Sequence, residues 1–347
     1  HWYLTGEKVV GIGEASGMFP IDVNKKAYRS DLLNTANDLF KGKGFEKSVS
    51  AILPEIKLAG ESGGRLTSDG ATLLDPSGNL EAGSIMCPPE GDAGTGMVAT
   101  NTVAQNTGNI SAGTSAFAMV VLSDALKGMY PEIDVVTTPD GSEVAMIHTN
   151  NCTSDINDWM NIFGEVLSVM GVDFSSDKLY GQIFERSLES DDNIGGLLSY
   201  NYVSGENITD VETGYPLFVR EPNYNFNLAN FMKMHLYSAF STLKIGMDLL
   251  KNNESINIDK LIAHGGIFKT KGVAQQVLSS ALENKITVMD TASEGGAWGV
   301  SVLAYYTAQK SQQSLATFLN EVVFLNTEEV TTEPVEQEVI NFNNYVE

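Results

Sequence analysis

Two strands and two helices alternate between residues 261 and 308, and this order constrains the fold more than any other feature of the sequence. Apolar runs at 261–264 and 286–289 predict two buried strands. Helix-like segments follow them at 270–282 and 295–308, the first with apolar residues at helical spacing and the second with small residues at its start. This order is typical of parallel strands covered by helices, so the sequence predicts an α/β fold.

Other segments have weaker patterns. Apolar runs predict strands at 83–87, 110–112, 116–122, 144–148 and 195–202, and helical spacing predicts helices at 25–40, 93–105, 157–170 and 228–250. The last of these helices has one apolar stripe and is expected in the core. Glu14 and Ser16 are expected in a glycine-flanked loop, and 106–109 in a turn. The acidic end at 328–347 is expected to be a partly extended surface segment.

Length and charge favour two domains and exclude two classes of partner. A chain of 347 residues exceeds one typical domain of about 100–150 residues. Lysine and arginine number 21 against 44 aspartate and glutamate, which gives a net charge of −23. Nucleic acids and anionic membranes are held by Lys and Arg, so this charge argues against both. A phosphorylated small molecule stays compatible, because backbone N–H groups bind phosphate without net positive charge.

The cysteines and the apolar runs indicate in which cellular environment the chain is expected. Cys87 and Cys152 form no Cys-x-x-Cys pair and no cluster with the four histidines. Neither a disulfide framework nor a metal site is therefore expected, which fits a reducing, cytoplasmic environment. No apolar run approaches the ~18 residues of a membrane-spanning helix, and there is no signal-peptide pattern.

The stretch 91–122 contains groups suited to phosphate transfer. It opens with Asp92 between the small residues Gly91 and Ala93, and it closes on a glycine turn that carries Thr114. Small residues let the backbone approach a ligand closely. A carboxylate can position an attacking hydroxyl, and the N–H groups of a glycine turn can hold phosphate oxygens. Gly-Asp is also a common turn pair, so the local sequence alone leaves both interpretations open.

Three stretches are candidates for a nucleotide site. They are the turn Gly113-Thr114-Ser115, the pair Gly265-Gly266 with a helix start at Thr270, and the capped helix start at Thr153. Helix N-termini and turn N–H groups favour anions such as phosphate. Each stretch also has a purely structural interpretation, because glycine turns end many strands and Thr, Ser and Asp cap helices for stability.

Taken in order, these pieces resemble the FGGY family of carbohydrate kinases, in the actin-like ATPase superfamily. The matching residues are Gly91-Asp92 with the small-residue helix after them, then 111–115, 196–198 with 204–206, 264–266 with its helix, and Glu294 with 295–299. Their order and spacing extend over nearly the whole chain. The most similar members are the xylulose and ribulose kinases.

The resemblance implies a fold and a domain organisation. The fold is the actin-like ATPase (ribonuclease H-like) fold, with part of a first domain and a complete second domain. Residues 1–110 correspond to the remaining part of the sugar-binding domain, 111–310 to the nucleotide-binding domain and 311–347 to an acidic extension. A homodimer is compatible with this interpretation.

The resemblance also implies an activity. Kinases of this family transfer the γ-phosphoryl group of ATP, with Mg²⁺, to a sugar or polyol hydroxyl, and a pentulose such as xylulose or ribulose is favoured here. Asp92 matches the catalytic carboxylate, with Gly91 and Ala93 beside the sugar. The turn 113–115 matches the phosphate-contacting turn, and Gly265-Gly266 match the turn beside ribose and adenine.

Two parts of the family pattern differ in this chain. The family begins with an Asp-x-Gly-Thr hairpin that wraps the phosphates, and no such hairpin segment begins this chain, whose first residue is His1. After the paired glycines, Ile267 and Phe268 follow where the family has a third glycine and then a serine. The chain is therefore interpreted as the C-terminal part of a kinase. Alone, it is expected to bind nucleotide weakly and to transfer little phosphate.

Two other classes compete with the kinase. A non-catalytic nucleotide-binding protein of the same superfamily would share the nucleotide site but would be insensitive to Asp92→Asn. A hydrolase would use Ser115 or Ser16 as its nucleophile, but no Gly-x-Ser-x-Gly elbow surrounds either serine.

Overall fold

A mixed seven-stranded sheet lies at the centre of the computed structural model, which describes residues 1–220, 222, 224–289, 295–309 and 312–347. In sheet order, the strands are β13 (Glu329–Thr332), β12 (Ile286–Met289), β11 (Lys260–His264), β5 (Thr107–Ala112), β6 (Ala116–Val121), β8 (Glu143–Thr149) and β7 (Ile133–Thr137). β5, β11 and β12 are parallel, and the other neighbouring pairs are antiparallel. The expected α/β class is confirmed.

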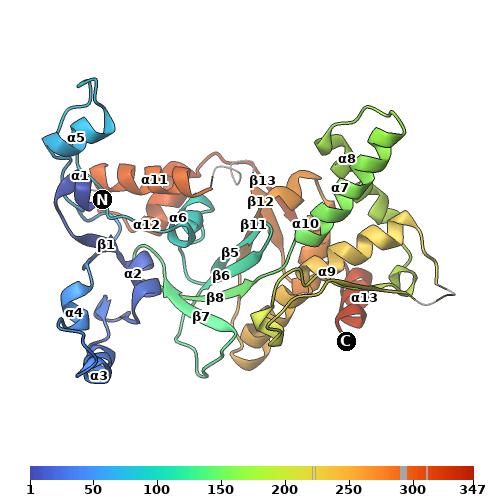
Figure 1. Cartoon of the computed structure of the whole chain (residues 1–347), viewed down its shortest axis with the longest axis horizontal. Coiled ribbons are helices and arrows are strands. Elements are labelled where there is room, and N and C mark those ends of the chain that lie inside the picture. Colours follow the sequence, from blue (N-terminus) through green and yellow to red (C-terminus); the bar gives the residue numbers. More distant parts are fainter. Residues whose placement is uncertain (221, 223, 290–294, 310–311) are drawn as a thin grey trace.

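Helices cover both faces of this sheet (Figure 1). One face packs against α6 (Asp92–Ala99), α11 (Gly295–Gln309) and α12 (Leu315–Phe318). The other packs against α7 (Ser154–Val169), α8 (Ser176–Arg186), α9 (Leu228–Asp248), α10 (Val273–Leu282) and α13 (Glu336–Val346). Strand side chains alternate between the two faces, so the neighbours Leu261 and Ile262 belong to different hydrophobic clusters.

The strongest sequence patterns give the elements that were predicted best. β12 has the expected bounds, and β6, β8, α7, α9 and α11 lie within one to three residues of theirs. The predicted strand at 83–87 is wrong, since only an isolated bridge between Ile85 and Arg65 forms there. The turn at 106–109 is also wrong, because β5 already begins at Thr107, and the helix at 93–105 ends early, at Ala99.

The N-terminal residues form small elements beside the sheet (Figure 1). They are α1 (Trp2–Thr5), β1 (Val9–Gly11), α2 (Ile12–Met18), β2 (Ile21–Asp22), β3 (Ala27–Tyr28), α3 (Ser30–Phe40), α4 (Val49–Ile52), β4 (Glu55–Lys57) and α5 (Ser68–Leu74). β1 and β4 pair in parallel. The loop expected around Glu14 and Ser16 is wrong, since both residues lie on α2. That helix is joined to β7 by a hydrogen bond from the Thr137 hydroxyl to the Ile12 carbonyl (3.0 Å).

The surface segment expected at 328–347 is correct in that β13 is extended and largely exposed, but wrong in that residues 336–346 form a helix anchored by the buried Phe342. β13 extends the central sheet, and α13 packs against α9 and α10. Phe342 is fully buried, Lys233 on α9 pairs with Glu338 at 2.5 Å, and Tyr345 donates its hydroxyl to the Ser199 carbonyl at 2.9 Å. Ser199 lies on β9 (Leu198–Tyr200), which pairs with β10 (Leu217–Val219).

In the described part of the chain, no helix combines the length and the apolar character needed to cross a membrane.

Candidate active site

The tip of the β5–β6 hairpin offers free backbone donors. Gly113 and Thr114 are exposed at this tip, and the Gly113 N–H donates to the Ser115 carbonyl (2.9 Å). Within the described residues, the N–H groups of Thr114 and Ser115 donate to no protein atom. Free N–H groups in a turn are suited to phosphate oxygens.

The start of α7 holds this tip in place. The Gly113 carbonyl accepts hydrogen bonds from the Thr153 N–H (3.1 Å) and the Thr153 hydroxyl (2.8 Å). The Thr114 carbonyl accepts from the Cys152 N–H (2.9 Å) and the Ser154 hydroxyl (3.2 Å). Thr153 is the N-cap residue of α7, but its side chain makes no capping bond within the helix. Its hydroxyl therefore binds the turn in place of the helix backbone, and these hydrogen bonds join the helix start and the turn into one unit.

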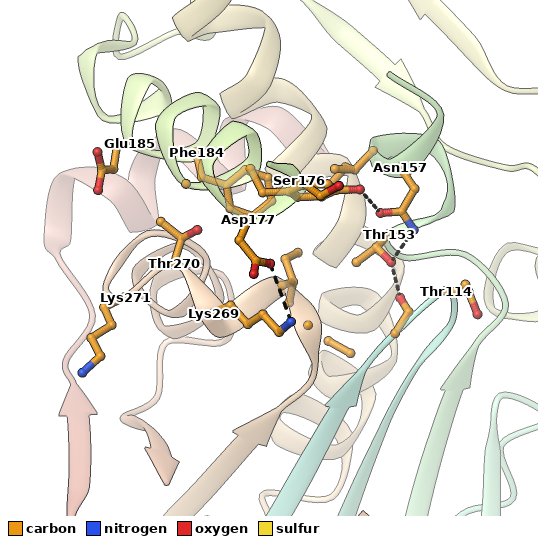
Figure 2. A pocket seen from close by; sticks show the side chains of 17 residues that line it. Thr114, Thr153, Asn157, Ser176, Asp177, Phe184, Glu185, Lys269, Thr270 and Lys271 are labelled. Atoms are coloured by element: carbon orange, nitrogen blue, oxygen red, sulfur yellow. Dashed lines mark hydrogen bonds and ion pairs between the residues drawn. The ribbon is translucent and has the colours of Figure 1, made fainter. Parts of the chain in front are cut away.

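A cavity of about 910 Å³ opens beside this unit (Figure 2). Of the residues that the sequence analysis named in its three candidate stretches, five line this cavity: Gly113, Thr114, Thr153, Gly266 and Thr270. Three stretches far apart in the chain therefore meet at one hollow. A side chain at Gly266 would meet no heavy atom within 4 Å of its Cβ, so the backbone there is open to a ligand.

Gly265 and Ser115 are placed differently. Gly265 has φ +129°, and a Cβ on it would lie 2.0 Å from the Ala112 carbonyl oxygen, so glycine is needed for the close approach of β11 to β5. It lines a second hollow, of about 550 Å³, together with His264. Burial lowers the pKa of His264, so its imidazole is neutral at pH 7. Ser115 contributes its free N–H at the tip but does not line the large cavity.

Helix α8 forms the wall opposite the turn, and the sequence analysis did not predict this helix. Phe184 and Asn157 are seen at the cavity in Figure 2. Tyr180 also lines it, and its hydroxyl donates to the Asn157 side chain on α7 at 2.8 Å. Lys269 Nζ and Asp177 Oδ1 form an ion pair at 3.9 Å in the cavity lining, and both side chains are largely exposed. The available helical signal was the spacing of Leu179, Tyr180, Ile183 and Phe184, which all pack on the core.

Asp92 lies at the first position of α6, close to the start of α11. Its carboxylate is exposed and accepts a hydrogen bond from the Ala93 N–H (2.9 Å). A Cβ on Gly296 would lie 3.9 Å from the Asp92 Cα. α11 follows the carboxyl end of β12, and the hairpin tip follows the carboxyl end of β5, which runs parallel to β12. Asp92, close to the start of α11, therefore lies at the same end of the strands as the hairpin tip. It does not line the large cavity, which opens among α7, α8 and the end of β11.

The letters Asp-x-Gly-Thr occur at 92–95, but these residues begin a helix and form no hairpin. Glu294, part of the last matching motif, lies outside the described residues. Gly296 and Gly299 of the same motif pack on Thr95, where a Cβ on Gly299 would lie 2.0 Å from the Thr95 carbonyl oxygen. These glycines therefore allow α11 to approach α6 closely.

Residues 108–308, more than half of the chain, match the C-terminal domain of the FGGY family of carbohydrate kinases. The chain belongs to this family. No curated protein sequence matches the chain. As an FGGY-family chain, it has the actin-like ATPase fold, and the resemblance inferred from the sequence is confirmed.

Solved structures show the same fold for this FGGY-family chain. Similar structures include ligand-bound xylulose kinase from Lactobacillus acidophilus (TM-score 0.76, 14% identity) and gluconate kinase from the same organism (0.75, 14%). Plasmodium falciparum glycerol kinase with ADP has a TM-score of 0.72 at 15% identity. Each comparison covers 99% of this chain and 64% of the other, so the chain spans less than two thirds of these kinases.

Glu90, a half-buried residue two positions before Asp92, was not singled out by the sequence analysis. Its Oε1 accepts from the Gly13 N–H (3.1 Å) and its Oε2 from the Glu14 N–H (2.8 Å), at the start of α2. Burial raises the pKa of Glu90 to about 7, and the charge of Glu14 adds to this rise, against the two N–H bonds that lower it. A carboxyl that titrates near neutrality therefore links α2 to the segment that leads into α6.

Proposed function

We propose that this chain is the nucleotide-binding and catalytic part of a kinase that phosphorylates a sugar or polyol hydroxyl with ATP. The observation that carries this proposal is the meeting of Gly113, Thr114, Thr153 and Gly266 at one cavity in an FGGY-family fold. The favoured acceptor is a pentulose such as xylulose or ribulose, since xylulose kinases are among the similar structures.

The residues present fit a nucleotide. A cavity of about 910 Å³ is within the range of small-molecule sites, and the two free N–H groups at the hairpin tip are available to bind an anion. Among the described residues, no group of three His, Cys, Asp or Glu side chains could hold a metal ion. Mg²⁺ is often bound by one or two carboxylates together with the phosphates of a nucleotide. In this proposal Mg²⁺ therefore binds together with ATP.

Each residue has a separate role in this proposal. ATP with Mg²⁺, when bound, supplies the phosphoryl group. The N–H groups of Thr114 and Ser115 hold phosphate oxygens, and Thr153 fixes the turn that presents them. The Asp92 carboxylate orients the acceptor hydroxyl and takes its proton as the new bond forms. Because positioning supplies most of the catalysis in phosphoryl transfer, a carboxylate of ordinary basicity is adequate.

Phosphoryl transfer from ATP to a panel of acceptors tests this proposal. In the natural polypeptide that contains these residues, Asp92→Asn should lower kcat about 10²–10⁴-fold, the contribution of a general base. ADP affinity should change less than about twofold, because Asp92 lies outside the cavity. Asp69→Asn is the matched control, since Asp69 is an exposed first-turn aspartate on α5. The panel is xylulose, ribulose, xylitol, glycerol and gluconate.

Nucleotide binding can be tested separately on the chain of 347 residues. Gly266→Phe should weaken ADP binding at least tenfold by filling the open side of the cavity, and Gly266→Ala should have a smaller effect. We expect weak nucleotide binding and little phosphate transfer by this chain alone. ADP binding with no acceptor phosphorylated by the natural polypeptide, and no effect of Asp92→Asn, would instead support the non-catalytic nucleotide-binding protein.

A further inference from the structure

Three glycines surround the Glu90 carboxyl group. A Cβ on Gly11 would lie 2.0 Å from Glu90 Oε1, and a Cβ on Gly13 would lie 2.6 Å from Glu90 Oε2. On the other side, a Cβ on Gly94 of α6 would lie 3.3 Å from the same oxygen. Together with the two N–H bonds at the start of α2, this cradle fixes α2 against α6.

The same contact places Glu14 beside Gly91, the residue that precedes the proposed catalytic Asp92. Glu14 donates its backbone N–H to Glu90, and its own Oε2 lies 2.1 Å from the position that a Cβ on Gly91 would occupy. Gly91 directly precedes Asp92. Two exposed acidic residues therefore adjoin Gly91, Glu14 of α2 in space and Asp92 of α6 in sequence.

These charges are not neutralised by a neighbouring base. None of the ion pairs within the described part of the chain includes Glu14, Glu90 or Asp92. A hydroxyl group can donate a hydrogen bond to a carboxylate, whereas a carboxylate brought close to another is repelled. The start of α6 therefore accepts hydroxyl groups and disfavours acids.

We propose that Glu14 determines acceptor specificity by charge, admitting neutral polyols and excluding sugar acids. This inference rests on the proposed function, which places the acceptor at Asp92. The fold does not decide the question, because a gluconate kinase and a xylulose kinase are both similar to this chain. Glu90 acts through Glu14 by fixing the start of α2.

A matched pair of ligands tests the inference. Xylitol and xylonate differ mainly in one terminal group, a neutral CH₂OH in the first and a carboxylate in the second. At pH 8 the natural polypeptide should bind xylonate at least tenfold more weakly than xylitol, measured by calorimetry or ligand-observed NMR. Glu14→Gln should reduce this ratio to about threefold or less. Glu46→Gln, at an exposed glutamate of the same N-terminal region, is the control and should leave the ratio unchanged.

The outcomes separate this inference from the proposed function. If xylonate binds as well as xylitol to the natural protein, or if Glu14→Gln leaves the ratio at its original value, Glu14 is not the selecting residue, although the kinase assignment survives. If neither ligand binds and no acceptor in the panel is phosphorylated, both proposals fail. A changed ratio with unchanged ADP affinity supports the inference, since a general loss of structure would weaken nucleotide binding too.

Discussion

Glu90 shows how one half-buried carboxyl group can make stability depend on pH. Its pKa is about 7 in the folded chain against an ordinary 4.5, because burial penalises the charged form. Between these values the folded chain binds more protons than the unfolded chain. The contribution of Glu90 to stability is therefore complete below about pH 4.5 and is lost as the pH rises through 7.

The direction of this pH dependence gives a prediction for the variant Glu90→Gln. A rise of about 2.5 pKa units corresponds to about 3 kcal/mol, so the stability of the natural chain relative to this variant should fall by about that amount between pH 4.5 and pH 8. Urea unfolding at several pH values measures the difference. Glu46→Gln should give a curve parallel to that of the natural chain. A constant difference for Glu90→Gln across the range would show that Glu90 titrates normally.

At the scale of elements, the crossing of α6 and α11 depends on small residues. A Cβ on Gly299 would lie 2.0 Å from the Thr95 carbonyl oxygen, and one on Gly296 would lie 2.9 Å from the Thr95 hydroxyl. Both contacts involve α6, the helix that carries Asp92. The crossing therefore sets the position of the proposed catalytic carboxylate and also packs the two helices together.

Gly299→Ala should therefore force the two helices apart. The expected loss of stability is about 1–3 kcal/mol, as for other overpacked cores, measured from the midpoint of chemical denaturation. Gly17→Ala on α2 is the control, because no atom lies within 4 Å of its Cβ, and alanine there should add about 0.5–1 kcal/mol. Equal stability of the natural chain and Gly299→Ala would contradict the close approach.

The elements that were predicted well are those whose own sequence explains them. β12 is a short apolar run that is mostly buried, and α9 is buried over most of its length, so their patterns are strong. β7 was missed because three of its five residues lie outside the core, as expected of an edge strand. α13 was missed because its place depends on partners such as Lys233 and Ser199, which are far away in sequence.

At the scale of the whole molecule, the sequence located the groups of the site but not their arrangement. The turn at 113–115, Thr153 and Gly266 were predicted as separate stretches. Parallel β5 and β11 bring the turn and Gly266 together, and the antiparallel pair β6–β8 brings Thr153 to the same place. The roles of these residues and of Asp92 stay predictions. Glu90 and Tyr180 had no motif to reveal them, because the cradle of three glycines and the wall opposite the turn exist only after folding.

The net charge of −23 predicts an unusual salt dependence for nucleotide binding. In the proposed function the hairpin tip would hold phosphate through neutral N–H groups, while the field of the whole chain repels an anion over roughly one Debye length, about 10 Å at 0.1 M salt. Raising NaCl from 20 to 200 mM should therefore strengthen ADP binding about two- to threefold, measured by calorimetry. Uncharged adenosine should show little change. Binding that weakens with salt would instead assign the main attraction to Lys269 and Lys271, which also line the cavity.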